Sequence, residues 1–163
     1  MIDQRAAVEF LDLPRLAVVG ASDAKDSFGG NVYRALKAHG TTVVPVHRES
    51  ETVDGDRCWS DIALVPTDLD GVIVMVGPEA AVNVVRAAID RGVPRIWLFR
   101  GIGGPGAVSD EAIRLCEDAG VEVIAGACPF MFLGNVGLLH RLHRRVRRAK
   151  GAVGVPVGGA GAG

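Results

Sequence analysis

The sequence lacks the features that mark secreted, membrane-spanning and metal-binding proteins. Its three cysteines, Cys58, Cys116 and Cys128, are odd in number, lie far apart and form no C-x-x-C pair, which favours a reduced compartment and predicts no metal site. No apolar run approaches the ~18 residues of a membrane span, and the first ten residues, MIDQRAAVEF, contain no signal-peptide core. We therefore expect a cytoplasmic protein without a membrane span.

Charge imbalance is also absent. The formal net charge is −1 at pH 7, and apolar residues make up 48% of the chain, so neither disorder nor a polyanionic partner for the whole protein is indicated. We expect no specific binding of nucleic acid. The 163 residues suggest one domain, which at this size buries roughly 70% of the chain's surface on folding.

One pattern occurs three times: a helix-like segment ends in glycine and an apolar strand follows at once. It is found as RALKAHG-TTVVPV, VVRAAIDRG-VPRIWLF and AIRLCEDAG-VEVIAG. Gly40, Gly92 and Gly120 stand where a left-handed residue closes a helix, and the strands are unbroken apolar runs, typical of a parallel sheet covered on both faces. The alternation predicts a doubly wound α/β fold, Rossmann-like, with a mainly parallel five-stranded sheet.

The expected strands are 16–20, 42–46, 71–76, 95–99 and 121–125, and the expected helices are 3–11, 29–39, 78–91 and 109–119. We predict a domain over residues 1–133, a basic helix over 134–150 and a Gly-rich disordered tail over 151–163.

Ligands of doubly wound folds bind at the carboxyl ends of the strands, so the loops that follow them are the candidate site. In the first loop, small residues at 20–22 let a phosphate approach the backbone. Gly29 and Gly30 then open a helix whose free N–H groups attract anions, and Lys25 adds a positive charge.

The other loops add basic residues and glycines. His47 and Arg48 follow the second strand, where NAD sites place an acid, and they suit the extra ribose phosphate of NADP or of coenzyme A. In the third loop Gly77 precedes Pro78 at a helix start. The fourth, residues 99–106, has four glycines and is predicted to be a flexible flap from which Arg100 reaches a diphosphate.

An ordered set of motifs supports this placement: AVVGAS (17–22), K-x-x-x-G-G-x-V-x-x-x-L (25–36), VVPV (43–46), GDRCWSDIALVP (55–66), DLDGVIVMVGPEAAVNVV (68–85), RIWLFRGI (95–102) and E-A-x-x-x-C-x-x-A-G-V-E-V-I (111–124). Together they resemble the coenzyme A-binding domain family. This Rossmann-like domain occurs in the succinyl-CoA synthetase α subunit, in ADP-forming acyl-CoA synthetases and in small stand-alone bacterial proteins. The resemblance covers about residues 10 to 130.

The resemblance implies that the chain binds coenzyme A or an acyl-CoA. The predicted cofactor-binding residues, which include Phe28, Arg100 and Cys128 from their places in the loops, are Gly20, Ala21, Ser22, Lys25, Phe28, Gly29, Gly30, Asn31, Val46, His47, Arg48, Val76, Gly77, Pro78, Arg100, Gly101, Ile102 and Cys128. Cys128 follows the fifth strand, and we hypothesise that it forms a mixed disulfide with coenzyme A.

The sequence shows no catalytic constellation. It has no serine in a G-x-S-x-G motif, and His140 and His143 have no carboxylate or cysteine nearby for a metal site. The phosphohistidine and nucleotide-grasp domain of the related synthetases lie outside the segment that this chain matches. The sequence therefore favours a non-catalytic binding or regulatory module.

Two alternatives remain. The basic residues after the second strand also fit an NADP-dependent oxidoreductase or a nucleotide sensor, although the first loop does not have dinucleotide spacing. The arginine-rich segment HRLHRRVRRAK (140–150) also fits a ligand-free scaffold subunit that contacts a protein partner through this helix.

Overall fold

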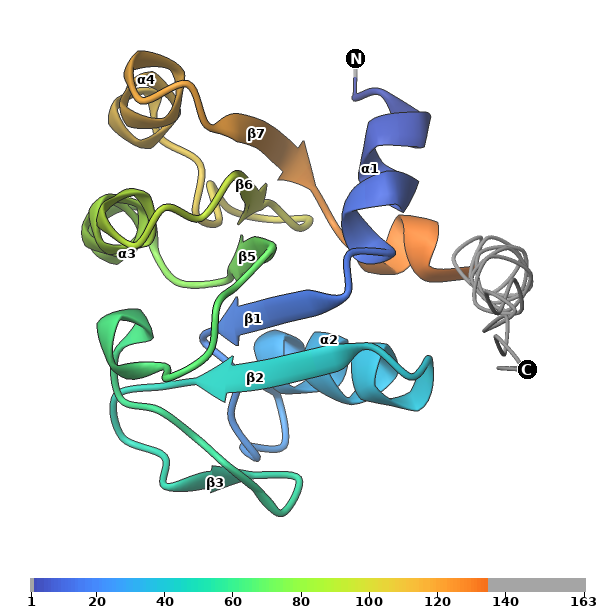
Figure 1. Cartoon of the computed structure of the whole chain (residues 1–163). Helices are drawn as coiled ribbons and strands as arrows, with labels where there is room; N and C mark the ends of the chain where they lie inside the picture. The colour runs from blue at the N-terminus through green and yellow to red at the C-terminus, as the bar shows by residue number, and fades with distance from the viewer. Residues whose placement is uncertain (1, 135–163) are drawn as a thin grey trace, which may run out of the picture.

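The computed structural model of the chain describes residues 2–134, which form a parallel sheet with helices on both faces (Figure 1). Its elements are α1 (Gln4–Leu11), β1 (Arg15–Val19), α2 (Phe28–Ala38), β2 (Thr42–Val46), β3 (Thr52–Val53), β4 (Asp56–Arg57), the short 3-10 helix η1 (Ile62–Leu64), β5 (Gly71–Val74), α3 (Pro78–Asp90), β6 (Arg95–Phe99), α4 (Asp110–Asp118) and β7 (Glu122–Ala127).

The main sheet has five strands in the order β2-β1-β5-β6-β7, and every neighbouring pair is parallel. This confirms the predicted doubly wound α/β fold. The strand order reverses between β1 and β5, because the chain moves outward to β2 first and then crosses to the other side of β1. That reversal is where folds of this type bind ligands.

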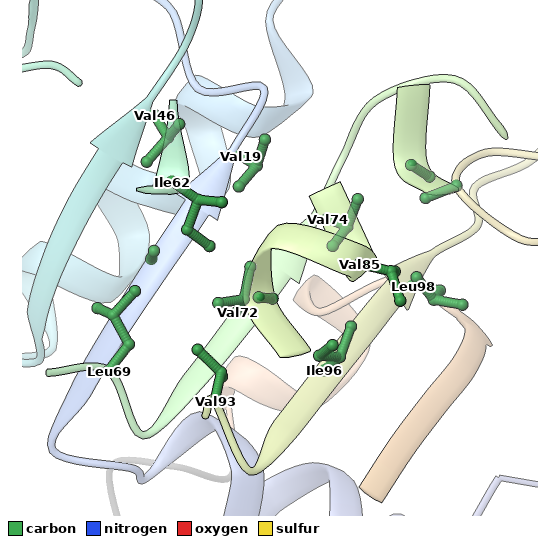
Figure 2. Packing of buried hydrophobic residues seen from close by; sticks show 14 of the residues in the cluster. Val19, Val46, Ile62, Leu69, Val72, Val74, Val85, Val93, Ile96 and Leu98 are labelled. Carbon is green, nitrogen blue, oxygen red and sulfur yellow. The ribbon is translucent and has the colours of Figure 1, made fainter. Parts of the chain in front are cut away.

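The strands are apolar on both faces because each face is covered by helices. Side chains alternate along the strands, so Val18, Ile73 and Trp97 join the core beneath α1 and α2. Their neighbours Val74 and Leu98 join the core beneath α3 and α4, which Figure 2 shows from close by. Two separate cores therefore account for the unbroken hydrophobic runs in the sequence.

Trp97 is the largest fully buried side chain of the described residues. Its ring meets Phe10 of α1 and Phe132 edge-on, with centroids 5.4 and 5.8 Å away. Its indole N–H donates to the main-chain oxygen of Ala127 at 3.0 Å. Phe132 belongs to a helical segment that begins at Phe130, so Trp97 joins α1, the sheet and the chain after β7.

The helix ends follow the sequence signals. Ser109 caps α4 by accepting the Ala112 N–H at 3.1 Å, and the three glycines that close helices, Gly40, Gly92 and Gly120, have φ values of +82°, +72° and +68°. The predicted element bounds agree with the structure to within two residues.

The antiparallel hairpin of β3 and β4 was not predicted from the sequence. Each of its strands has only two residues, too short for a hydrophobic pattern. Its turn is Asp54-Gly55, with φ values of +50° and +79°, and Asp-Gly is the usual signal for such a turn. That dipeptide was the available clue.

Among residues 2–134, no helix is long and apolar enough to cross a bilayer. The predicted basic helix (134–150) and Gly-rich tail (151–163) lie outside the described residues, apart from Gly134.

Candidate functional site

The loops predicted to form the site meet at the carboxyl edge of the sheet. The Gly20 N–H donates to the Val46 oxygen at 2.8 Å, which joins the ends of β1 and β2. Gly20 also lies against the end of β5, since a Cβ there would stand 2.5 Å from the Met75 oxygen. At the other side, the Arg100 N–H donates to the Ala127 oxygen at 3.3 Å. All four predicted loops therefore border one edge.

Gly29 and Gly30 are required because α2 begins directly against the preceding loop. A Cβ on Gly29 would lie 2.2 Å from the Gly20 oxygen, and a Cβ on Gly30 would lie 2.0 Å from the Ser22 oxygen. Real side chains cannot occupy such positions, so the two glycines set the helix onto the end of β1. From the sequence, these glycines were expected only to open a helix whose N–H groups attract anions.

The first turn of α2 leaves two N–H groups free. Ser27 is the N-cap, and its Oγ accepts the Gly30 N–H at 2.9 Å and the Ser22 N–H at 3.3 Å. The Gly30 N–H is therefore not free to meet an anion, which corrects the sequence-based expectation for that group. The N–H groups of Phe28 and Gly29 have no acceptor among residues 2–134, and the turn carries no acidic side chain. These are the properties of an anion site at a helix N-terminus.

The side chains around this turn differ in their freedom. Lys25 is exposed in the loop and Ser22 is half-buried. Asn31 is exposed, but its side-chain oxygen accepts an Arg34 N–H at 2.7 Å, so it is held along the helix. Of the polar side chains predicted in this loop, Lys25 and Ser22 remain available to a ligand.

At the end of β2, His47 and Arg48 lie beside Trp59, which was not among the residues predicted from the sequence. The His47 N–H donates to the Trp59 oxygen at 2.9 Å. The His47 Nδ1 accepts the Glu49 N–H at 3.3 Å, which leaves Nε2 as the ring nitrogen available to a ligand. Arg48 is exposed. Its Nε is 3.9 Å from the Glu49 carboxylate in a pair that is largely in solvent and therefore weak.

Trp59 extends this basic end of the site. The guanidinium of Arg57 lies 4.0 Å from the centre of the Trp59 ring, within the range of a cation–π contact. The Trp59 N–H donates to the Pro45 oxygen at 3.1 Å, so the residue continues the edge of β2. A half-buried aromatic ring and three basic side chains, Arg57, His47 and Arg48, thus gather at one strand end.

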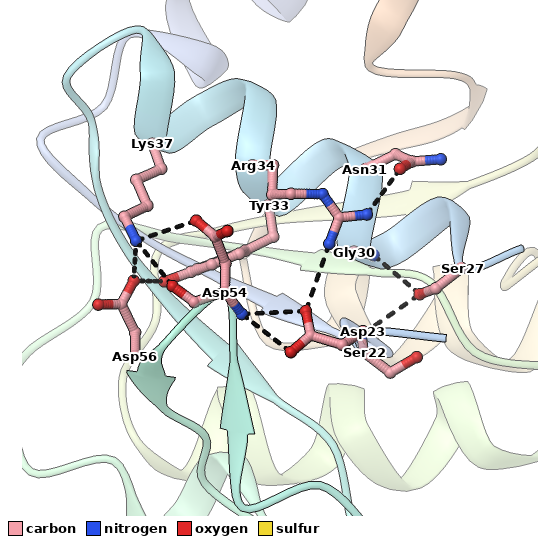
Figure 3. Close-up of polar contacts among 10 residues, drawn as sticks. All are labelled: Ser22, Asp23, Ser27, Gly30, Asn31, Tyr33, Arg34, Lys37, Asp54 and Asp56. Carbon is pink, nitrogen blue, oxygen red and sulfur yellow. Dashed lines mark hydrogen bonds and ion pairs between the residues drawn. The ribbon is translucent and has the colours of Figure 1, made fainter. Parts of the chain in front are cut away.

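The β3–β4 hairpin, which contains Arg57, is held against α2 and the first loop by a polar network (Figure 3). Lys37 of α2 pairs with Asp54 and Asp56 at 3.0 and 2.6 Å, and the Tyr33 hydroxyl donates to Asp56. These contacts lower the pKa of Asp56, chiefly through the hydrogen bond from Lys37. Burial, followed by the bond to Asp56, raises the pKa of Tyr33. Tyr33 therefore stays a hydroxyl donor, and the network is structural.

The loop after β5 presents backbone instead of polar side chains. Gly77 is the N-cap of α3 and offers no side-chain cap, and Pro78 occupies the first turn. A Cβ on Gly77 would meet nothing within 4 Å, so internal packing does not require glycine there. The half-buried Val76 lies against Gly20.

The loop after β6 folds back onto Phe99. A Cβ on Gly101 would lie 2.9 Å from the Phe99 ring, and Gly106, with φ +59°, comes so close that a Cβ would lie 2.1 Å from the Phe99 oxygen. The Ala107 N–H donates to the same oxygen at 2.8 Å. Packing thus explains Gly101 and Gly106, while Gly103 and Gly104 have nothing within 4 Å.

This second end of the site is apolar. The rings of Phe28 and Phe99 stack with centroids 6.4 Å apart, which joins the start of α2 to the end of β6. Phe28 is 64% exposed and Ile102 is fully exposed. Arg100, which directly follows Phe99 in the sequence, is also exposed.

The three cysteines differ in exposure. Cys58 and Cys116 are buried, and burial raises the pKa of both thiols, that of Cys116 to about 11. Cys128 is half-buried just after β7, two strands away from β5 and three from β1. No group of three possible metal-ligating side chains occurs among the described residues.

The comparisons with known proteins agree with this architecture. Residues 14–133 match the family model described as a CoA binding domain. The uncharacterized protein YneT of Bacillus subtilis is 26% identical over 114 residues, which cover 70% of this chain and 81% of YneT.

Larger proteins contain the same domain. The acetate–CoA ligase (ADP-forming) II subunit alpha of Pyrococcus furiosus is 24% identical over 119 residues, which span 69% of this chain but only 26% of that subunit. Among solved structures, a conserved hypothetical protein from Pyrococcus furiosus is 31% identical with a TM-score of 0.64. The match covers 71% of this chain and 96% of that protein.

Proposed function

The chain belongs to the CoA-binding domain family, and from that premise we propose that it binds coenzyme A or an acyl-CoA as a non-catalytic binding or regulatory module. The observation that carries the proposal is the free N–H pair of Phe28 and Gly29 at the switch point of the sheet, beside Ser22 and Lys25. This is the kind of site that holds a diphosphate.

The nucleotide end of the ligand is placed toward β2. The 3′-phosphate of coenzyme A carries negative charge, and Arg48, His47 and Arg57 supply donors at that strand end. Arginine is well suited to phosphate because its planar N–H groups bind two oxygens together. The adenine stacks on the Trp59 ring in place of the exposed Arg57 guanidinium that lies over it, since every base can stack on an aromatic ring.

The remaining predicted residues follow from this orientation. The pantetheine arm runs over the backbone of Val76, Gly77 and Pro78 and then beneath the loop that contains Arg100, Gly101 and Ile102. Its thiol points toward Cys128. Gly20 and Ala21 form the floor at the end of β1, next to Val46.

The surroundings of three candidate nucleophiles, Ser50, Cys58 and Cys116, support a non-catalytic role. The Ser50 hydroxyl lies 3.1 Å from His47 Nδ1, but that nitrogen also accepts the Glu49 N–H. No carboxylate among residues 2–134 bonds the other ring nitrogen, so a third triad member is missing. Cys58 and Cys116 are buried with raised pKa values, which makes poor nucleophiles.

Thermal unfolding with coenzyme A, acetyl-CoA, NADP and NAD, each added in turn, tests the proposal. A ligand at ~100 times its Kd adds about 2.7 kcal/mol, or roughly 5–10 °C for a domain of this size. We expect a shift with the two CoA species only. A shift with NADP instead favours the oxidoreductase or nucleotide sensor, and no shift with any ligand favours the scaffold.

Two variants test the placement. Lys25→Ala and Arg48→Ala are each expected to weaken coenzyme A binding about tenfold, since each removes a charge-assisted contact to phosphate. Arg114→Ala is the matched control, because Arg114 is an exposed arginine on α4, away from these loops. Unchanged affinity in both site variants contradicts the placement.

A further inference from the structure

The two ends of the carboxyl edge differ in chemistry. The β2 end carries Arg48 and Arg57 with Trp59, whereas the β6 end carries Phe28, Phe99 and Ile102. We call Phe28, Phe99 and Ile102 the apolar patch. In the sheet, β1 and β5 lie between the two ends, so a ligand that spans the edge meets charge at one end and hydrocarbon at the other.

The apolar patch is built from parts distant in sequence. Phe28 is the first residue of α2, Phe99 is the last of β6, and their rings stack at 6.4 Å. The absence of a side chain on Gly101 lets the loop lie against the Phe99 ring, and the next residue, Ile102, is fully exposed. An isoleucine wholly in solvent gains nothing for the fold of this chain.

Phe28 belongs both to the proposed diphosphate site and to the apolar patch. Its main-chain N–H is one of the two free donors proposed to hold the diphosphate, and its ring is 64% exposed and faces the Phe99 ring. The apolar patch is therefore continuous with the proposed ligand site at a single residue. A group carried by the bound ligand can cover the patch without any further protein partner.

We infer that the physiological ligand is an acyl-CoA with an apolar acyl chain, and that Phe28, Phe99 and Ile102 recognise that chain. The inference rests on the proposed function and adds the class of acyl group. The nucleotide occupies the basic end of the edge, and the thiol lies toward Cys128, next to the end of β6, where Phe99 pairs with Ala127. From there the acyl chain turns back over Phe99 and covers the apolar patch. Acyl groups with several methylenes bind more tightly than acetyl, and free coenzyme A binds most weakly.

Calorimetric titration with coenzyme A and with its acetyl, butyryl, hexanoyl and octanoyl thioesters tests the inference. Each methylene that becomes buried is expected to tighten binding about three- to fourfold. We therefore expect affinity to rise with chain length until the patch is covered. The slope of affinity against chain length is the quantity that matters, because a contact to the nucleotide alone does not change it.

Ile102→Ser and Phe28→Ser are expected to reduce this slope. Any contact that these residues make with the coenzyme A part of the ligand changes the affinity for all the ligands equally and leaves the slope as it was. Leu64→Ser is the matched control. Leu64 is an apolar residue that is 56% exposed, close to the 64% of Phe28. Its 3-10 helix is held to the C-terminal end of α3, where Arg91 donates to the Ile62 and Val65 oxygens. The control should keep the wild-type slope.

The outcomes separate the two proposals. If coenzyme A and all its thioesters bind equally, or if the slope persists in both patch variants, this inference is wrong and the proposed function stands. If no CoA species binds, the proposed function itself fails. If the slope is absent and Ile102→Ser changes the sedimentation coefficient, the patch joins two copies of the chain instead, which also overturns the inference.

Discussion

The Asp23 carboxylate accepts the main-chain N–H of Asp54 with both oxygens, at 3.0 and 3.1 Å. Asp23 belongs to the loop after β1, and Asp54 lies in the turn between β3 and β4 with a left-handed φ of +50°. The contact joins the loop proposed to hold the diphosphate to the hairpin whose far strand leads into Trp59. The two walls of the proposed site are therefore held in one relative position.

Asp23→Ala removes this acceptor and leaves the Asp54 N–H to water. We expect the free energy of unfolding to fall by about 1 kcal/mol, or roughly 2–4 °C in Tm. Asp23→Asn keeps one oxygen acceptor and should lose less. Hydrogen exchange at the Asp54 amide should become faster in the alanine variant. An unchanged Tm together with unchanged exchange would show that the hairpin is held without Asp23.

Gly29→Ala and Gly30→Ala should each destabilise the protein by about 1–3 kcal/mol through overpacking. Alanine in a helix normally stabilises relative to glycine, so the sign of the effect identifies close packing as its cause. Gly104→Ala is the control, because a Cβ there meets nothing within 4 Å and its φ is not left-handed. Chemical denaturation of the three variants measures the difference, and a stabilising Gly29→Ala contradicts the close approach of α2 to the Gly20 oxygen.

The two tryptophans provide separate optical probes. Trp59 is half-buried beside the proposed nucleotide site, whereas Trp97 is fully buried. If an adenine stacks on Trp59, coenzyme A should quench the tryptophan emission of the wild type. Trp59→Phe should retain the emission of Trp97 and lose the ligand-dependent change, with binding itself measured by calorimetry. A quench that persists in Trp59→Phe would place the adenine elsewhere.

Alkylation should distinguish the three cysteines. Cys58 and Cys116 are buried, and their raised pKa values keep the thiols protonated near neutral pH, so iodoacetamide should modify Cys128 first in the native protein. Intact mass and peptide mapping give the order of reaction, with Cys128→Ser as the control. Rapid native-state labelling of Cys116 would contradict the burial of its side chain.

Oxidised coenzyme A tests the mixed disulfide predicted from the sequence. The Cys128 thiolate would attack one sulfur of the CoA disulfide, and one CoA would leave as its thiolate. A mass increase of one coenzyme A in the wild type that is absent in Cys128→Ser would support the hypothesis, and the absence of any such adduct would contradict it.

Acid stability should depend on the pair formed by Arg15 and Asp70. The Arg15 Nε and Nη2 donate to the two Asp70 oxygens at 3.0 and 3.1 Å, and these bonds hold the pKa of Asp70 below its ordinary 3.8. Because the folded pKa is the lower one, the stabilisation is fully present above the ordinary pKa and is lost as the pH falls through the folded value. Tm measured from pH 2 to 7 should therefore fall less steeply below about pH 4 in Asp70→Asn than in the wild type. Parallel curves would show that Asp70 does not contribute to the acid transition.

The sequence by itself determined the class of fold and selected the loops of the candidate site. The three helix-glycine-strand junctions at Gly40, Gly92 and Gly120 specify alternating α and β elements, because only a left-handed residue closes each helix so abruptly. Continuous apolar strands require helices on both faces of the sheet. In such a fold the loops after the strands must share one edge, so the pattern of strands was enough to select the candidate loops.

Tertiary structure alone decided what the individual residues do. Gly29 and Gly30 approach the Gly20 and Ser22 oxygens, Asp23 reaches the Asp54 N–H across 31 residues, and the Phe28 ring meets Phe99. None of these contacts has a local sequence signature, because each depends on how far the crossovers carry one element toward another. Local spacing fixes the period of an element, but the distance between loops follows from strand order and from the depth at which each helix packs.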